Sequence, residues 1–142
     1  MLGWAGWARY VLSSLRRCTI IDPLILGISG QFISQPLDRL AEELATNLHG
    51  PVYLMRMLLP GFVSRGNGCV INIVSRAGTV DMPMNTNYAV SKAALIRLTS
   101  CVQEELNLGG NQNIHLYSLH PGALQTKLTT SKPRSNDRGE SC

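Results

Sequence analysis

Apolar and polar positions along the chain change their period several times, and each change predicts an element. Apolar residues recur every 3.6 residues through 36–64, which predicts a long helix, and a second helix is predicted over 86–107. Continuous runs of β-branched and apolar residues predict buried strands at 69–75 and 113–119. A shorter apolar run over 19–30, which ends in glycines, predicts another short buried strand.

The alternation of strands and helices predicts an α/β fold with parallel strands. The helix over 86–107 then serves as the crossover between its two neighbouring strands. The loop over 76–85 should lie at the carboxyl end of the preceding strand, where open α/β sheets bind ligands. Pro51 interrupts the first helix because it has no N–H to offer the carbonyl of Asn47. We therefore expect a bend close to Asn47.

Composition changes this interpretation little. The 142 residues are enough for one domain, 44% of them are hydrophobic, and the net charge is +4. No basic stripe alternates with aromatic residues, so we expect no nucleic-acid partner. No uninterrupted apolar run reaches the roughly 18 residues of a membrane span, so we expect no membrane partner. The cysteines lie far apart in the sequence without a CxxC pair, which predicts reduced thiols in a cytoplasmic protein and no metal site.

The two ends of the chain differ from its centre. Residues 1–21 contain no acidic residue and mix arginines with aromatic side chains. We interpret residues 1–18 as a non-core or disordered extension, and a mitochondrial presequence over 1–21 is the alternative. Residues 129–142 are polar and without periodicity, which predicts a disordered tail. The predicted domain is therefore residues 19–128.

A chemically suggestive pair lies on the second predicted helix. Tyr88 and Lys92 are one turn apart and project from the same face. A free phenol has a pKa of about 10, and a fixed ammonium beside a phenol favours the phenolate. Ser75 closes the strand predicted before this helix, and its hydroxyl is placed there to hold a carbonyl oxygen for protonation. The pair alone also fits an ordinary aromatic ring beside a solvated cation, so the wider pattern has to decide.

Four motifs supply that wider pattern. They are Asn47-Leu-His-Gly50, Ile71-Asn-Ile-Val-Ser75, Tyr88-Ala-Val-Ser-Lys92 and Pro121-Gly-Ala-Leu-Gln-Thr126. Their order and spacing resemble the short-chain dehydrogenase/reductase (SDR) family, a Rossmann-fold family, over about residues 36–130. The resemblance implies a doubly wound parallel sheet in three αβα layers, of which this chain would contain an incomplete part.

The resemblance also implies a reaction and its residues. The reaction is hydride transfer between NAD or NADP and a carbonyl or secondary alcohol. Tyr88 would be the acid and base, and Lys92 would activate the phenol and bind the ribose hydroxyls. Ser75 would orient the carbonyl, and Asn47 would hold a proton-relay water. The implied cofactor contacts are Tyr88, Lys92, Pro121, Gly122, Leu124 and Thr126.

Two regions of the family pattern have no match in these residues. The glycine-rich loop that holds the pyrophosphate is not found, and no substrate region follows residue 129. Asp22 and Leu24 keep only a trace of the family's Asp-x-Leu-x-Asn-Asn-Ala-Gly strand end. We therefore expect a truncated chain that retains the catalytic half. An active oxidoreductase, a catalytically dead interaction module and a non-functional gene product all remain open.

The expected partners are a small carbonyl or alcohol substrate and a second copy of the chain. In the SDR family, the two long helices form a four-helix dimer interface. The resemblance thus implies a homo-oligomer through the helices around 36–64 and 86–107. A dead module would pair with a full-length relative through these same helices. The alternative use of the two helices is ordinary packing onto the chain's own sheet.

Overall fold

The computed structural model describes residues 18–22, 27 and 29–122, and the expectations for residues 1–17 and 129–142 lie outside this part. Its elements, in chain order, are β1 (Cys18–Ile21), η1 (Phe32–Ser34), α2 (Leu37–Leu44), η2 (Ala45–His49), α3 (Gly50–Arg65), β2 (Gly68–Ile73), η3 (Arg76–Gly78), α4 (Thr86–Leu108) and β3 (Ile114–Leu119). Both long helical stretches, and the strands predicted at 69–75 and 113–119, occur close to where the hydrophobic pattern predicts them.

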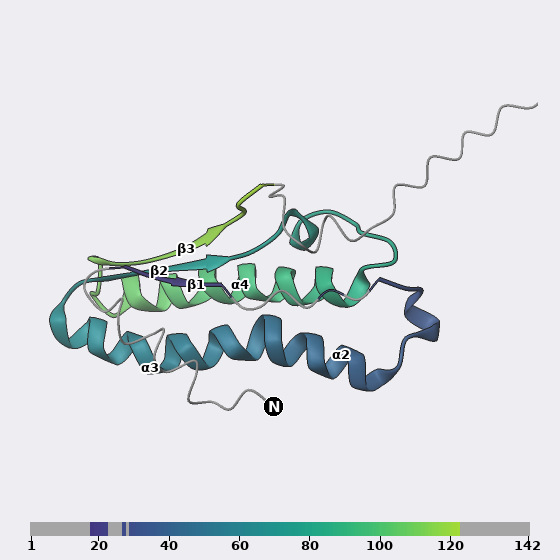
Figure 1. Ribbon diagram of the computed structural model, residues 1–142. Coiled ribbons are helices and arrows are strands. Elements are labelled where there is room, and N and C mark those ends of the chain that lie inside the picture. The colour runs from purple at the N-terminus through teal and green to yellow at the C-terminus, as the bar shows by residue number, and fades with distance from the viewer. Residues whose placement is uncertain (1–17, 23–26, 28, 123–142) are drawn as a thin grey trace, which may run out of the picture.

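The three strands form one parallel sheet in the order β1-β2-β3. The helices α2 and α3 connect β1 to β2, and α4 connects β2 to β3. In Figure 1 these helices lie on one side of the sheet. The predicted α/β class and the parallel pairing of the two central strands are confirmed.

The core fills the space between the helices and this face of the sheet. Its buried side chains come from both layers, namely Ile21, Met55, Leu58, Phe62, Val70, Leu106, Ile114 and Leu116. A Cβ at Gly68 would overlap the Phe62 ring, so only glycine lets α3 approach β2 this closely. The buried Asn72 side chain donates to the Thr99 hydroxyl at 2.9 Å and joins β2 to α4. Burial of this apolar set is the main stabilising contribution to the fold.

The opposite face of the sheet is open among the described residues. Ile20, Tyr117 and Leu119 project from it and are 64%, 52% and 47% exposed. The described part of the chain therefore forms two of the three layers of the expected αβα architecture. The fold is partial in the manner that the sequence resemblance implies.

The first long helix contains one turn of π-helix, η2, between α2 and α3. Here the N–H of Gly50 donates to the carbonyl of Ala45, five residues earlier. The irregularity lies at Asn47, where the proline argument predicts it, because Pro51 cannot supply the α-helical donor. The helix ends at Arg65, and Gly66 adopts the left-handed conformation (φ 71°) that closes many helices.

Two predicted strands are longer in the sequence interpretation than in the structure. The strand expected over 69–75 ends at Ile73, so Ser75 lies outside it and caps η3. The strand expected over 19–30 is only Cys18–Ile21, and its residues alternate between exposed and buried. Continuous burial was wrong because helices cover only one face of this strand. No described helix has the length and apolar character needed to cross a membrane.

Candidate active site

The carboxyl ends of parallel strands meet at one edge of a sheet, and the predicted site residues gather there. Asp22 follows β1, Ser75 follows β2, and Pro121 and Gly122 follow β3. Pro121 and Gly122 are exposed, and Gly122 has a φ of 81° that glycine adopts without strain. Tyr88 lies in the first turns of α4, the helix that β2 leads into.

Lys92 is the most constrained side chain of this group. It is fully buried, and its Nζ donates to the carbonyl of Ile73, the last residue of β2, at 3.0 Å. The same nitrogen lies 5.7 Å from the centroid of the Tyr88 ring. Burial lowers the pKa of Lys92 below the ordinary lysine value, and the negative charge of Asp22 acts in the opposite direction. The strand end thus holds a cation beside the phenol ring.

Asn47 joins the π-turn to the same helix. Its buried side chain Nδ2 donates to the hydroxyl of Ser91 at 3.3 Å. The Ser91 hydroxyl in turn donates to the carbonyl of Tyr88 at 2.7 Å. Because Ser91 directly precedes Lys92, this chain of hydrogen bonds links the π-turn to the turn of α4 that holds both catalytic candidates.

Ser75 lies between the end of β2 and η3, where it caps η3. Its Oγ accepts a hydrogen bond from the N–H of Ala77 at 3.2 Å, and the hydroxyl hydrogen remains able to donate. A Cβ at Gly78 would lie 2.8 Å from the backbone nitrogen of Ala93 and from the carbonyl carbon of Lys92. Only a glycine therefore allows η3 to lie against α4. This contact fixes Ser75 in the segment that packs beside Lys92.

The segment after β1 lies near the start of α4. A Cβ at Gly27 would contact the Tyr88 ring at 3.8 Å, an ordinary van der Waals distance. Farther along, the N–H of Gly30 donates to the carbonyl of Met84 at 2.7 Å. Met84 has a φ of 69°, which is unusual for a residue other than glycine. This backbone contact ties the first segment of the chain to the loop in front of Tyr88.

The structure thus links Asn47 through Ser91 to the turn of α4 that carries Tyr88 and Lys92. Ser75, Pro121 and Gly122 follow strands that end at the same sheet edge. Leu124 and Thr126 lie outside the described residues. The sequence interpretation missed Ser91 and Gly78, and it linked Asp22 only to a trace of the family's strand end. A signal existed for Ser91, because a serine hydroxyl three residues after a helical carbonyl can bond back to it. The role of Gly78 depends on a contact between η3 and α4 that no local pattern reveals.

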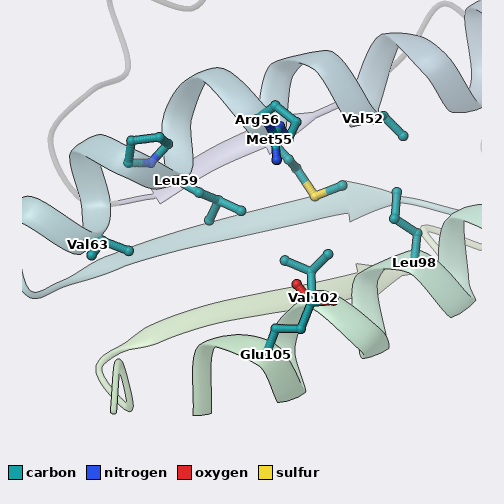
Figure 2. A pocket seen from close by; sticks show the side chains of 9 residues that line it. Val52, Met55, Arg56, Leu59, Val63, Leu98, Val102 and Glu105 are labelled. Carbon is teal, nitrogen blue, oxygen red and sulfur yellow. The ribbon is translucent and has the colours of Figure 1, made fainter. Parts of the chain in front are cut away.

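A groove of about 470 Å³ runs between α3 and α4 (Figure 2). Its lining is mainly apolar and comes from both helices: Val52, Met55, Arg56, Leu59, Pro60, Val63, Leu98, Val102 and Glu105. None of these residues belongs to the group around Tyr88. The groove is therefore a separate feature from the candidate active site.

Comparison with known proteins finds similarity to short-chain dehydrogenases along most of the chain. The family model described as short chain dehydrogenase matches residues 12–137 of this chain. L-xylulose reductase of Caenorhabditis elegans is 35% identical over 100 residues, covering 70% of this chain and 38% of that protein. (3R)-3-hydroxyacyl-CoA dehydrogenase of the dog, Canis lupus familiaris, is 32% identical over 137 residues, covering 92% of this chain and 52% of that protein.

Solved structures show the same fold. A short-chain dehydrogenase from Streptomyces avermitilis matches with a TM-score of 0.72 and 28% identity, over 87% of this chain and 45% of that one. The structure described as ElxO with NADP bound matches with a TM-score of 0.75 and 20% identity, over 89% and 50%. The chain spans about half or less of the length of these proteins. It belongs to the short-chain dehydrogenase family and covers a part of the family's typical length.

Proposed function

We propose that this chain provides the proton-transfer part of an NAD(P)-dependent oxidoreductase site that interconverts a carbonyl and a secondary alcohol. The observation that supports this most is the buried Lys92 ammonium, which is fixed between the end of β2 and the ring of Tyr88. The names of the relatives support the reaction class. L-xylulose reductase and (3R)-3-hydroxyacyl-CoA dehydrogenase share a carbonyl or hydroxyl carbon as the reacting group.

Tyr88 is the proposed acid and base. In the reducing direction, its hydroxyl gives a proton to the carbonyl oxygen as the negative charge develops there. Lys92 stabilises the phenolate that remains, because an adjacent cation favours the charged form of a phenol. The hydrogen bond from Lys92 to Ile73 keeps the ammonium in place during the transfer.

Ser75 and Asn47 have supporting roles in this proposal. The Ser75 hydroxyl donates to the substrate oxygen and holds it within reach of Tyr88, as a positioned donor does in an oxyanion site. The family resemblance gives Asn47 the role of holding a relay water. Its position in the π-turn beside Ser91 supports that role, because Ser91 is the neighbour of Lys92.

NAD or NADP, when bound, supplies or accepts the hydride. The residues present fit the ribose end of such a cofactor. An ammonium has three donors, and Ile73 is the one hydrogen-bond acceptor found for Lys92 among the described residues. Lys92 and Tyr88 would bind the ribose hydroxyls, and Pro121, Gly122, Leu124 and Thr126 would contact the nicotinamide carboxamide. The similar fold solved with NADP bound supports this cofactor class.

The direct test is a fusion protein in which the nucleotide-binding half of a relative precedes this chain. The joined protein should consume NADH or NADPH in the presence of a carbonyl substrate, measured by the loss of cofactor absorbance. The same relative's own catalytic half is the positive control. A joined protein that folds and binds the cofactor, yet reduces no carbonyl that the control reduces, would contradict the proposal.

The groove between α3 and α4 supports a second role, self-association (Figure 2). We propose that a second copy of the chain covers this groove, with the same pair of helices from each copy in contact. Val63, which lines the groove, is 43% exposed, so the chain itself leaves apolar surface of the groove uncovered. Light scattering of the purified chain tests this role. Association with a full-length relative, measured on the mixture, would identify the chain as an interaction module.

A further inference from the structure

Two cysteines that lie far apart in the sequence face each other across the sheet. Cys18 on β1 is the direct register partner of Cys69 on β2. Their sulfur atoms are 2.7 Å apart, which is inside the van der Waals contact distance of two sulfur atoms. Adjacent strands lie about 4.7–4.9 Å apart, and disulfides bridge Cα atoms that are about 4.4–6.8 Å apart.

The pair is also accessible from solvent. Both side chains project from the face of the sheet that no described helix covers, the face that carries Ile20 and Tyr117. Cys18 is exposed and Cys69 is partly buried. Cys101, the other cysteine in the described part of the chain, lies on α4 and is exposed. A small oxidant can therefore reach Cys18 without any opening of the core.

We propose that Cys18 and Cys69 form a reversible disulfide that locks β1 onto β2. The oxidant is a small-molecule disulfide of the glutathione class. The Cys18 thiolate attacks one sulfur of that molecule and releases its other half as a thiolate, which leaves a mixed disulfide on Cys18. The Cys69 thiolate then attacks the Cys18 sulfur and releases the second half. The two protein thiols lose two electrons and two protons, and the oxidant becomes two thiols.

The order of attack follows from the surroundings of each thiol. Burial raises the pKa of Cys69 to about 12, and the hydrogen bond with Cys18 and the charge of Cys18 act in the same direction. Thiolates are the attacking species, so the exposed Cys18 reacts first with the oxidant. Cys69 then resolves the mixed disulfide because it lies next to Cys18 in the register. The free thiols of a folded chain are thus arranged for an intramolecular bond.

The lock would act on the weakest part of the sheet. β1 has four residues and is an edge strand among the described elements. Asp22, which acts electrostatically on Lys92, directly follows it. A covalent bond between β1 and β2 would close a long loop and keep this strand paired. The oxidised chain should therefore unfold at a temperature higher by roughly 5 °C or more.

The experiment uses the full chain with Cys101→Ser and Cys142→Ser, so that only the proposed pair remains. The protein is treated with oxidised glutathione, both folded and in denaturant, then alkylated and digested without reduction. Mass spectrometry should find the Cys18 peptide joined to the Cys69 peptide. The bond should form at least about tenfold faster in the folded chain, because the fold raises the effective concentration of the two thiols. Dithiothreitol should reverse the bond and the gain in melting temperature.

Three results would overturn the proposal. They are a stable mixed disulfide on Cys18 without the internal bond, cross-links only between chains, or equal rates in the folded and denatured protein. Adding Cys69→Ser to the same background is the matched control. This variant should retain one glutathione on Cys18 and show no increase in melting temperature. Neither readout depends on oxidoreductase activity, so the inference is tested apart from the proposed function.

Discussion

The ammonium of Lys92 lies 5.7 Å from the centre of the Tyr88 ring while it donates a hydrogen bond to the carbonyl of Ile73. Within the described residues, no carboxylate lies within ion-pair distance of this cation. Asp22 acts electrostatically on this cation without forming an ion pair with it. The positive charge of Lys92 is therefore not neutralised by an ion pair and can stabilise the phenolate of Tyr88. An activating lysine needs this property.

The first prediction concerns Tyr88→Phe in the enzyme completed with a relative's nucleotide-binding half. This change removes only the oxygen that transfers the proton, so turnover should fall by at least ~10²-fold. The dissociation constant for NAD(P)H should change much less than turnover, because Lys92 remains to bind the ribose hydroxyls. Steady-state rates and a fluorescence titration of the cofactor measure the two quantities. Normal turnover in the phenylalanine variant would remove Tyr88 from the proposed mechanism.

Ser75→Ala and Lys92→Ala are compared in the same enzyme. Losing the Ser75 hydroxyl should lower turnover by about 10²-fold, the effect of one positioned donor, and leave cofactor binding intact. Lys92→Ala should weaken both turnover and cofactor binding, since one ammonium serves the phenol and the ribose. The pattern across the two measurements distinguishes the roles. A Ser75 variant that loses cofactor affinity instead would contradict the assignment.

The second prediction concerns stability against pH. The pKa of Lys92 in the folded chain is lower than the ordinary 10.5, because burial disfavours its charged form. Between those two values the unfolded chain binds more protons than the folded one, so the free energy of unfolding rises with pH. Below this window both states are protonated, and the contribution of Lys92 does not change.

Lys92→Met isolates this contribution, because methionine is apolar and of similar length. Urea unfolding of both proteins across a pH series gives the difference in their free energies of unfolding. The original chain should gain stability relative to the variant as the pH rises towards 10.5. A relative loss over that range would mean that the folded state favours the charged lysine.

Patterns in the sequence predict the elements of this fold well because each element has a local signal. The helix over 86–107 is observed as Thr86–Leu108, and the strand over 113–119 as Ile114–Leu119. Pro51 predicts an irregularity at Asn47 because a missing N–H is a property of one residue. The end of β2 was placed two residues too far along. Val74 and Ser75 are as compatible with a strand as their neighbours, and only the cap of η3 ends it.

Contacts between distant segments have no such local signal. Cys18 and Cys69 are 51 residues apart, and their pairing depends on the register of two strands. The approach of Gly78 to the backbone of Lys92 depends on how η3 lies against α4. The sequence therefore identifies Tyr88 and Lys92 through their spacing on one helix. It cannot reveal which residues of other elements hold them in place.

The third prediction tests the contact between η3 and α4. Gly78→Ala adds a Cβ at 2.8 Å from backbone atoms that cannot move without displacing the helix. We expect a loss of about 1–3 kcal/mol in the free energy of unfolding. Gly61→Ala in α3 is the matched control, because its nearest contact is the flexible end of Arg65 at 3.4 Å. Alanine in a helix interior should leave stability unchanged or raise it by about 0.5–1 kcal/mol.

Urea unfolding of the two glycine variants measures these differences. In the completed enzyme, Gly78→Ala should also lower turnover, because displacing η3 moves Ser75. Equal stability of the two variants would mean that η3 is free to shift away from α4. The described packing would then not be what positions Ser75.

The last prediction concerns the groove between α3 and α4. Val63 lines this groove (Figure 2) and is 43% exposed. Met57 lies on the same helix and is 75% exposed, but it does not line the groove. If a second copy covers the groove, Val63→Lys places a charge in the contact, where burying an unpaired ammonium is costly. The dimer dissociation constant should rise by about tenfold or more, which corresponds to ~1.4 kcal/mol.

Met57→Lys adds the same charge outside the groove and should have a smaller effect. Sedimentation velocity over a concentration series measures both constants. Unchanged association in the Val63 variant, or dissociation caused by the Met57 variant alone, would place the contact elsewhere on the chain.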